Sequence, residues 1–300
     1  MPSSVREIIS VPDAAVGSVY IITMKIDFGN TTYIMGILNV TPDSFFDGGR
    51  YVTRQQAVDR AAQMIAEGAD IIDVGGESSR PGADPVSGEE EMQRVCPVIE
   101  DISKRFDVMI SVDTCKAPVA ESALRCGAVI VNDISGMSFD SGMCPVVAAS
   151  GCYVVLMHIK GTPKTMQQDP VYDNVVRDVY NDLKEKVDIA LRGGVHRDKI
   201  IIDPGFGFGK TVDHNYELLA NLEVFKGMGL PVLVGLSRKS MVKKLLGEGD
   251  DTLPGTLALN AISAVKGADI IRVHDVEVHK LSMKSVDIVK RFSVQNGSAA

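Results

Sequence analysis

Residues 199–210 read KIIIDPGFGFGK, and this stretch decides the fold. Three consecutive isoleucines without polar alternation predict a strand that is buried on both faces, as in a parallel sheet covered by helices. The strand is expected to end at Asp203, because Pro204 cannot donate to the hydrogen-bond ladder of a sheet. The three alternating glycines that follow let the backbone approach another group without a Cβ atom in the way. The stretch therefore predicts a parallel strand followed by a binding loop.

The same loop ends in Gly-Lys-Thr at residues 209–211 and so resembles a nucleotide-binding phosphate loop. The spacing between its two framing glycines is one residue too short for that motif. A binding loop of another kind is therefore favoured.

The chain has 300 residues and a formal net charge of −8. This length suffices for one large core, and barrels of alternating strands and helices commonly reach it as a single domain. The acidic balance argues against a nucleic-acid partner, because phosphate backbones are bound by basic surfaces. A local basic pocket for a small anion stays possible.

The cysteines number 5 and show no metal-type Cys-x-x-Cys spacing. They are expected to be reduced thiols in a cytoplasmic protein. Before residue 33 the apolar runs are short and interrupted by charged residues, so neither a secretory signal nor a membrane span is predicted. The expected partners are small molecules, with no nucleic acid and no membrane.

One pattern occurs three times. Residues 68–73, 127–132 and 267–272 read GADIID, GAVIVN and GADIIR, and each runs from a glycine that ends a helix, through an apolar strand, to a polar residue. Self-similarity of this kind is typical of a repeated helix–strand unit.

Helix-sized segments separate the remaining expected strands, which cover residues 33–40, 108–113, 153–158, 199–203 and 231–235. Thr53 and Gln56 predict a capping box, and Asp169 with Pro170 predicts the start of a helix that ends at Gly193. About eight such units without adjacent hairpins favour an α/β fold of the closed (β/α)8 TIM barrel type over an open doubly wound sheet.

The expected domain boundaries follow from the same pattern. Residues 1–18 are interpreted as an N-terminal extension, and two short β-rich runs within residues 19–33 as a hairpin that closes the bottom of the barrel. Residues 19–292 form the single barrel domain, and residues 293–300 a flexible tail.

Nearly every expected strand ends on a polar residue, although core strands should be apolar to their tips. These residues are Asn39, Asp73, Asp113, Asn132, His158, Asp203, Ser237, Arg272 and His274. In a barrel they all converge on the C-terminal rim, where active sites lie. A single one, such as Asp113 before Thr114, is as well explained as a helix cap. The whole ring is better explained by an active site.

The ring also sorts by charge. Asp113, Asn132 and Asp203 supply acceptors and an amide, which suits a heterocycle with adjacent N–H donors. Cations and donors suited to a phosphate group come from Arg80, Ser237, Arg238, Lys239, Arg272 and His274. A neutral ring and an anionic group are therefore expected in one ligand. A salt-bridge network for the two carboxylates and a solvated surface for Arg238 stay open as alternatives.

Seven segments together resemble the dihydropteroate synthases. They are MGILNVTPDSF at residues 35–45, DVGGESSRPG at 73–82, SVDT at 111–114, VNDI at 131–134, DPGFGFGK at 203–210, GLSRKS at 235–240 and IRVHD at 271–275. The resemblance runs in order from about residue 33 to residue 289, which makes it more specific than any single motif.

This resemblance implies a transferase of folate biosynthesis that joins p-aminobenzoate to 6-hydroxymethyl-7,8-dihydropterin diphosphate and is the target of sulfonamides. Asp47, Asp113, Asp203 and Lys239 would be catalytic. The pterin would be held by Asp113, Asn132, Asp203, Phe208, Lys239 and Arg272. The diphosphate would be held by Asn39, Arg80, Arg272 and His274, and p-aminobenzoate by Phe45, Ser79, Arg80, Pro81 and Ser240. The resemblance also implies Mg²⁺ as cofactor with Asn39 as its ligand, and a homodimer.

The resemblance has departures. Ser79 stands where the family more often has threonine, and Phe46 and residues 159–160 also differ from the usual pattern. These differences put loop detail in doubt and leave the family assignment in place.

Other functions stay open at this level. A pterin-dependent methyltransferase would share the barrel and the carboxylate pocket, but would have no use for a diphosphate clamp of Arg272 with His274. Lys239 would be a Schiff-base lysine in a carbonyl enzyme, which borohydride trapping would reveal. A pterin-binding module without catalysis would have lost rim residues.

Overall fold

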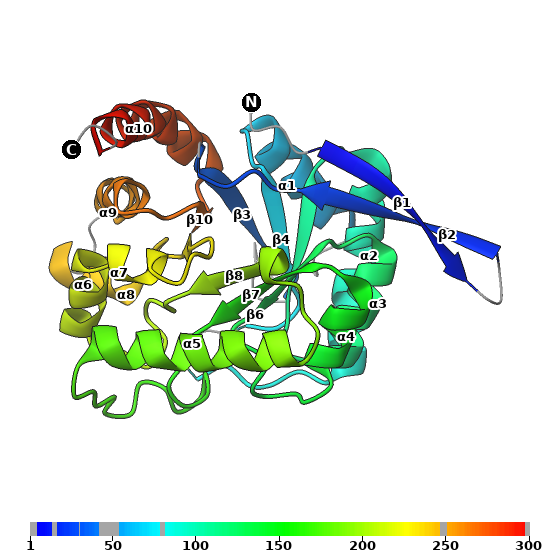
Figure 1. The fold of residues 1–300 in the computed structure, drawn as a ribbon, viewed down its shortest axis with the longest axis horizontal. Coiled ribbons are helices and arrows are strands. Elements are labelled where there is room, and N and C mark those ends of the chain that lie inside the picture. The colour runs from blue at the N-terminus through cyan, green and yellow to red at the C-terminus, as the bar shows by residue number, and fades with distance from the viewer. Residues whose placement is uncertain are drawn as a thin grey trace.

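The computed structural model describes residues 5–13, 17–29, 31–41, 54–78, 82–246 and 251–297 (Figure 1). At its centre lies a parallel sheet whose strands follow the order β8-β7-β6-β5-β4-β3-β10-β9. The strands are β3 (Tyr33–Asn39), β4 (Ile71–Gly75), β5 (Met109–Asp113), β6 (Ile130–Asp133), β7 (Tyr153–Met157), β8 (Ile200–Asp203), β9 (Leu233–Val234) and β10 (Ile270–Val273). Ile202 at the open edge bridges to Val232, and its N–H donates to the Pro231 carbonyl at 2.9 Å. The sheet is therefore closed into a barrel.

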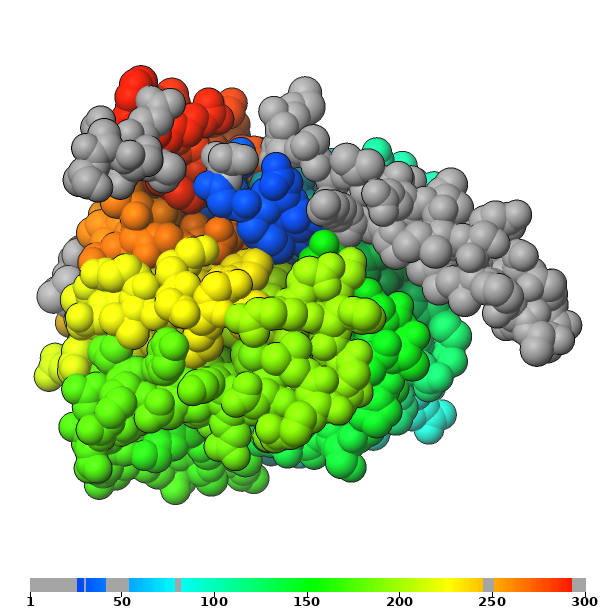
Figure 2. Space-filling model, viewed as in Figure 1, coloured from blue at the N-terminus to red at the C-terminus, as the bar shows by residue number. Residues whose placement is uncertain are grey.

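Helices follow the strands and form the outer layer. They are α1 (Arg54–Ala66), α2 (Gly88–Arg105), α3 (Ala117–Cys126), α4 (Met143–Ser150), α5 (Val175–Arg192), α6 (Val212–Ala220), α7 (Glu223–Lys226), α8 (Ser240–Leu246), α9 (Leu253–Val265) and α10 (Val276–Gly297). In Figure 2 the side chains over α5, α6 and α7 form a continuous surface that hides the strands on this face. The predicted (β/α)8 barrel is confirmed. No helix within the described part of the chain combines the length and the apolar character needed to cross a membrane.

Side chains alternate along each strand between the interior of the barrel and the helical layer. One buried cluster fills the lower interior and includes Tyr33, Met35, Ile71, Met109, Ile130, Tyr153, Val155, Ile201, Leu233 and Ile270. Continuing the same alternation toward the C-terminal ends of the strands brings Asp73, Asp113 and Asn132 to the interior, above the apolar layer. The barrel is thus apolar at the bottom and polar at the rim.

The hairpin lies earlier in the chain than expected. It consists of β1 (Val5–Asp13) and β2 (Gly17–Lys25), paired antiparallel, so its first strand falls in the stretch interpreted as an extension. Figure 1 shows it projecting past α2 and α3 rather than covering the barrel. Ile26 closes the bottom instead, because it joins the interior cluster and its N–H donates to the Tyr153 hydroxyl at 3.1 Å.

Two expected boundaries are wrong. Helix α5 begins at Val175, because the Asn174 side chain accepts from the Arg177 N–H at 2.8 Å and caps it, while Asp169 has a φ of 47° that no helix start adopts. Helix α10 continues to Gly297, past the expected tail boundary at residue 292. Thr53 of the predicted capping box lies outside the described residues.

Candidate active site

A buried carboxylate gathers the strand-end residues at the rim. Asp73 on β4 is fully buried, and its Oδ2 accepts from Arg272 Nε at 2.6 Å and from Asn132 Nδ2 at 3.1 Å. Arg272 Nη2 donates in turn to Asp113 Oδ2 at 2.7 Å. Strands β5, β6 and β10 therefore bring Asp113, Asn132 and Arg272 together around Asp73 of β4, as predicted.

Asp113 lies under conflicting influences. Burial raises the pKa of its carboxyl to about 7, Arg272 opposes this rise, and the neighbouring Asp73 charge adds to it. One guanidinium thus stands between the carboxyl groups of Asp73 and Asp113. A ligand that presents N–H donors would be favoured here.

The glycine loop after β8 forms the second part of the site. The Gly205 N–H donates to Asp203 Oδ1 at 2.7 Å, and Phe208 is buried with the Lys239 Nζ 4.0 Å from the centre of its ring. Burial raises the pKa of Asp203 to about 6, against the backbone hydrogen bond and Lys239, and lowers the pKa of Lys239 to about 8. Asp203, Phe208 and Lys239 therefore lie in one partly desolvated part of the rim.

Lys210 has a structural role that the sequence reasoning missed. Its Nζ donates to the carbonyls of Gly205 at 2.8 Å and Phe208 at 3.0 Å, and lies 2.8 Å from His158 Nδ1. Burial, together with the Lys210 charge, lowers the pKa of His158 to about 2, so this histidine is neutral. Lys210 therefore braces the loop from below and does not face a phosphate. In the sequence, Lys210 stands within Gly-Lys-Thr, as the lysine of a phosphate loop does, and nothing in that motif indicates the contact with His158.

The cationic side of the rim is smaller than predicted. The Ser237 hydroxyl lies 3.0 Å from His274 Nδ1 and accepts from the His274 N–H at 3.2 Å, which holds the imidazole beside β10. Arg238 instead pairs with Asp275 at 2.6 Å with 59% of its side chain exposed. Arg238 therefore belongs to the surface, as its alternative interpretation held.

Asn39 lies at the end of β3, next to the site. A Cβ atom at Gly75 would stand 3.8 Å from Asn39 Oδ1 and 3.5 Å from the Cβ of Asp113, so the three strand ends are adjacent. Within the described ranges, no group of three or more His, Cys, Asp or Glu side chains is arranged to hold a metal ion. Asn39 offers a neutral oxygen ligand, which fits Mg²⁺ only if phosphate oxygens and water supply the rest.

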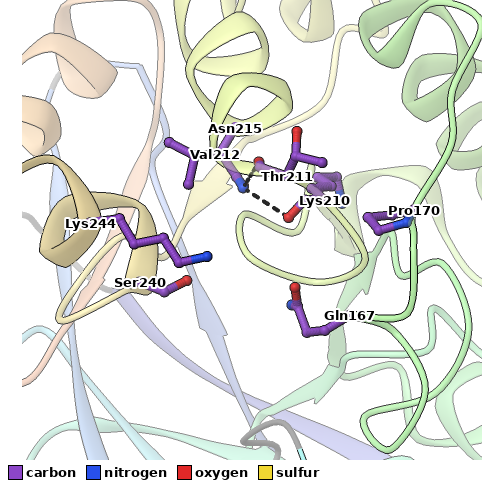
Figure 3. A pocket seen from close by; sticks show the side chains of 8 residues that line it. All are labelled: Gln167, Pro170, Lys210, Thr211, Val212, Asn215, Ser240 and Lys244. Carbon is purple, nitrogen blue, oxygen red and sulfur yellow. Dashed lines mark hydrogen bonds between the residues drawn. The ribbon is translucent and has the colours of Figure 1, made fainter.

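Ser240, predicted to contact p-aminobenzoate, lines a pocket of about 190 Å³ beside the glycine loop. Figure 3 shows Ser240 and Lys244 of α8 on one side, facing the start of α6 and the loop that carries Gln167. The other lining residues are Pro170, Lys210, Thr211, Val212 and Asn215. None of the lining side chains is acidic, so the pocket suits an anion such as a carboxylate.

Five predicted site residues lie outside the described residues, namely Phe45, Asp47, Ser79, Arg80 and Pro81. Among the described residues on either side of positions 79–81, Glu77 Oε1 accepts from the Val86 N–H at 2.8 Å, and Lys116 Nζ donates to Glu77 Oε2 at 2.7 Å. Their roles stay predictions.

The chain matches known proteins over most of its length. Residues 35–274 match the family model described as "Pterin binding enzyme". The chain is 50% identical to the dihydropteroate synthase of Escherichia coli strain K12 over 256 residues, 85% of this chain and 90% of the relative.

Solved structures agree. The Yersinia pestis dihydropteroate synthase with a sulfonamide drug superposes with a TM-score of 0.82 at 44% identity and covers 87% of this chain and 94% of its own. The Xanthomonas albilineans enzyme with 4-aminobenzoic acid also gives 0.82, at 39% identity, and covers 90% and 95%.

Proposed function

Because this chain belongs to the dihydropteroate synthases, we propose how its residues divide the work of that reaction. The enzyme condenses 6-hydroxymethyl-7,8-dihydropterin diphosphate with p-aminobenzoate and releases pyrophosphate. This assignment of roles rests mainly on one observation. Asp113, Asn132 and Arg272 lie together around Asp73, and Asp203 and Lys239 lie nearby.

The pterin ring is assigned to the acceptor side. Asp113, Asn132 and Asp203 accept from the ring N–H groups, Arg272 packs over the ring, and Phe208 and Lys239 border it. The burial of Asp203, Asn132 and Phe208 supports this assignment, because a charge-assisted bond is strong in a desolvated pocket.

The diphosphate is assigned to Asn39, Arg272 and His274, with Arg80 as a further predicted contact. The adjacency of Asn39 to Asp113 and the position of His274 beside Ser237 support a neighbouring anion site. A Mg²⁺ ion held by Asn39 and the substrate would offset the charge of the leaving diphosphate. Loss of diphosphate before attack would leave a cation-like pterin methylene, which the Asp113 and Asp203 carboxylates would stabilise.

The aromatic amine is assigned to the region of Ser240. The carboxylate of p-aminobenzoate would lie toward Ser240 and the cationic pocket of Lys244. An aromatic amine is a weak nucleophile that needs no strong base once the methylene is cation-like, so this chain's residues mainly position it and exclude water.

Ordered binding is the expected consequence of this division. Alone, p-aminobenzoate should bind weakly in calorimetry, and pterin, pyrophosphate and Mg²⁺ should tighten it by about tenfold, a coupling of about 1.4 kcal/mol. His274→Ala should reduce the coupling and leave the binding of pterin alone unchanged. Equal p-aminobenzoate affinity with and without pyrophosphate would rule out the order.

A homodimer is also proposed, through α9 and α10. Six of the ten exposed large hydrophobic side chains in the described chain lie on these two helices, namely Ile262, Val265, Leu281, Ile288, Val289 and Phe292. The two helices lie side by side in Figure 1. Exposed apolar side chains gathered on neighbouring helices are typical of a subunit interface.

Light scattering should give the mass of a dimer for the natural protein and that of a monomer for Ile288→Glu with Phe292→Glu. Val171→Glu, at a side chain that is 63% exposed elsewhere on the surface, is the control and should leave the dimer intact. A dimer that survives the double substitution would place the interface elsewhere.

A cytoplasmic location is also proposed. The five cysteines are free thiols, which supports a reducing compartment.

A further inference from the structure

Asp73 occupies the centre of the site, yet no ligand contact is assigned to it. It points into the barrel from the middle of β4, directly across from Ser111 on β5, and no part of it is exposed. Its Oδ2 receives both Arg272 Nε and Asn132 Nδ2, while its Oδ1 has no hydrogen-bond partner among the described residues. A buried carboxylate in this position needs its cation, because an unpaired charge away from water is costly.

The contact with Asn132 has a consequence for the ring. A carboxylate only accepts hydrogen bonds, so Asp73 must take the Nδ2 of Asn132 and cannot face its Oδ1. The amide is thereby held in one of its two orientations. The Oδ1 of Asn132 is left as the acceptor for a ligand, which a heterocycle with N–H donors requires.

The contact with Arg272 acts in the same direction. Two different carboxylates, Asp73 at Nε and Asp113 at Nη2, hold the guanidinium at 2.6 and 2.7 Å and so fix its plane. A planar cation held at two points is pre-organised to pack over a ring. Without Asp73, the guanidinium would keep a hydrogen bond only to Asp113 among the described residues.

We propose that Asp73 is a positioning residue for pterin recognition, which fixes the orientation of the Asn132 amide and the plane of the Arg272 guanidinium. The inference rests on the proposed function, since it requires that these two residues meet the pterin. Asp73 itself touches no substrate in this scheme and acts through its two neighbours.

The test is the affinity for 6-hydroxymethylpterin, measured by calorimetry with the full chain. Asp73→Ala should weaken it by about tenfold or more, because it removes the oxygen that accepts from both Asn132 Nδ2 and Arg272 Nε. Ser111→Ala is the matched control and should leave the pterin affinity unchanged, since it removes a buried hydroxyl, opposite Asp73, that has no partner among the described residues. Thermal unfolding of both variants establishes that they are folded.

A double-mutant cycle separates positioning from general destabilisation. If Asp73 acts through Asn132, Asp73→Ala should cost clearly less in an Asn132→Ala background than in the natural protein, because the amide that it orients is already gone. Equal costs in the two backgrounds would overturn the inference, as would unchanged pterin affinity in Asp73→Ala.

The conservative substitution at the same position gives an independent readout. The amide oxygen of Asp73→Asn can stand where Oδ2 stands and accept from both Arg272 Nε and Asn132 Nδ2, so this variant should keep pterin affinity within about threefold of the natural value. If Asp73→Ala does not fold, Asp73→Leu, which fills the volume without an acceptor, decides: pterin affinity as high as that of Asp73→Asn overturns the inference. Absence of synthase activity in the natural protein would instead count against the proposed function.

Discussion

Gly205→Ala is expected to lower the free energy of unfolding by roughly 3 kcal/mol or more and to abolish synthase activity. Gly205 has a φ of 70°, and a Cβ atom there would stand 1.9 Å from the carbonyl oxygen of His158. The obstructing atom is backbone at the end of β7 and cannot rotate away. Either the glycine loop or β7 would have to move, and with it Asp203 and Phe208.

Gly151→Ala is the control for this substitution. Gly151 has a similar φ of 64° at the end of α4, but a Cβ atom there would meet nothing within 4 Å. Its cost should be only the roughly 1–2 kcal/mol of a left-handed alanine. Urea unfolding of both variants measures the difference, and equal losses would show that the contact with His158 does not matter.

Asp113→Asn and Asp203→Asn are each expected to weaken pterin binding by about 1–3 kcal/mol and to reduce synthase activity accordingly. Each substitution keeps the shape of the side chain and replaces an acceptor by an N–H group that faces the N–H donors of the ring. Calorimetry with pterin measures the loss. Asp101→Asn, at the surface ion pair with Arg54, should leave the affinity unchanged. Unchanged affinity in both site variants would rule out the assignment of the ring to these carboxylates.

The pH dependence of pterin binding follows from the same carboxylates. Burial raises the pKa of Asp113 to about 7 and that of Asp203 to about 6, although Arg272 and Lys239 respectively oppose the rise. Pterin needs the ionised forms, so its affinity should fall as the pH drops from 8 to about 6. Asp113→Asn should flatten this fall, and calorimetry across the pH range measures it.

The stability of the ligand-free protein should change in the opposite direction. Because the folded pKa of each carboxyl lies above its unfolded value, the folded state holds more protons than the unfolded chain between about pH 4 and pH 7. The contribution of both groups to stability is therefore lost as the pH rises through that window. Ionisation of Asp113 and Asp203 therefore lowers the stability of the ligand-free protein and raises its affinity for pterin.

The local sequence by itself determined the strand ends. Apolar runs such as the three isoleucines before Asp203 are long enough to identify buried parallel strands, and the closed barrel then places Asp113, Asn132 and Arg272 on one rim. This inference needs only the alternation of side chains along a strand, which is a property of neighbouring residues, and the rule that parallel strands of a barrel end on one rim. The family resemblance added the substrates.

The partners of each side chain depended on the tertiary structure. The sequence marked Asp73 as one strand end among nine, and only the packing of β4, β6 and β10 shows that it holds Asn132 and Arg272 together. By its sequence context Lys210 resembles a phosphate-loop lysine. In the structure it lies beside His158, because β7 and the glycine loop are neighbours. Strand periodicity fixes on which face and at which end a side chain lies. Contacts between residues 59 to 199 positions apart depend on how the strands are staggered around the barrel, which no local pattern encodes.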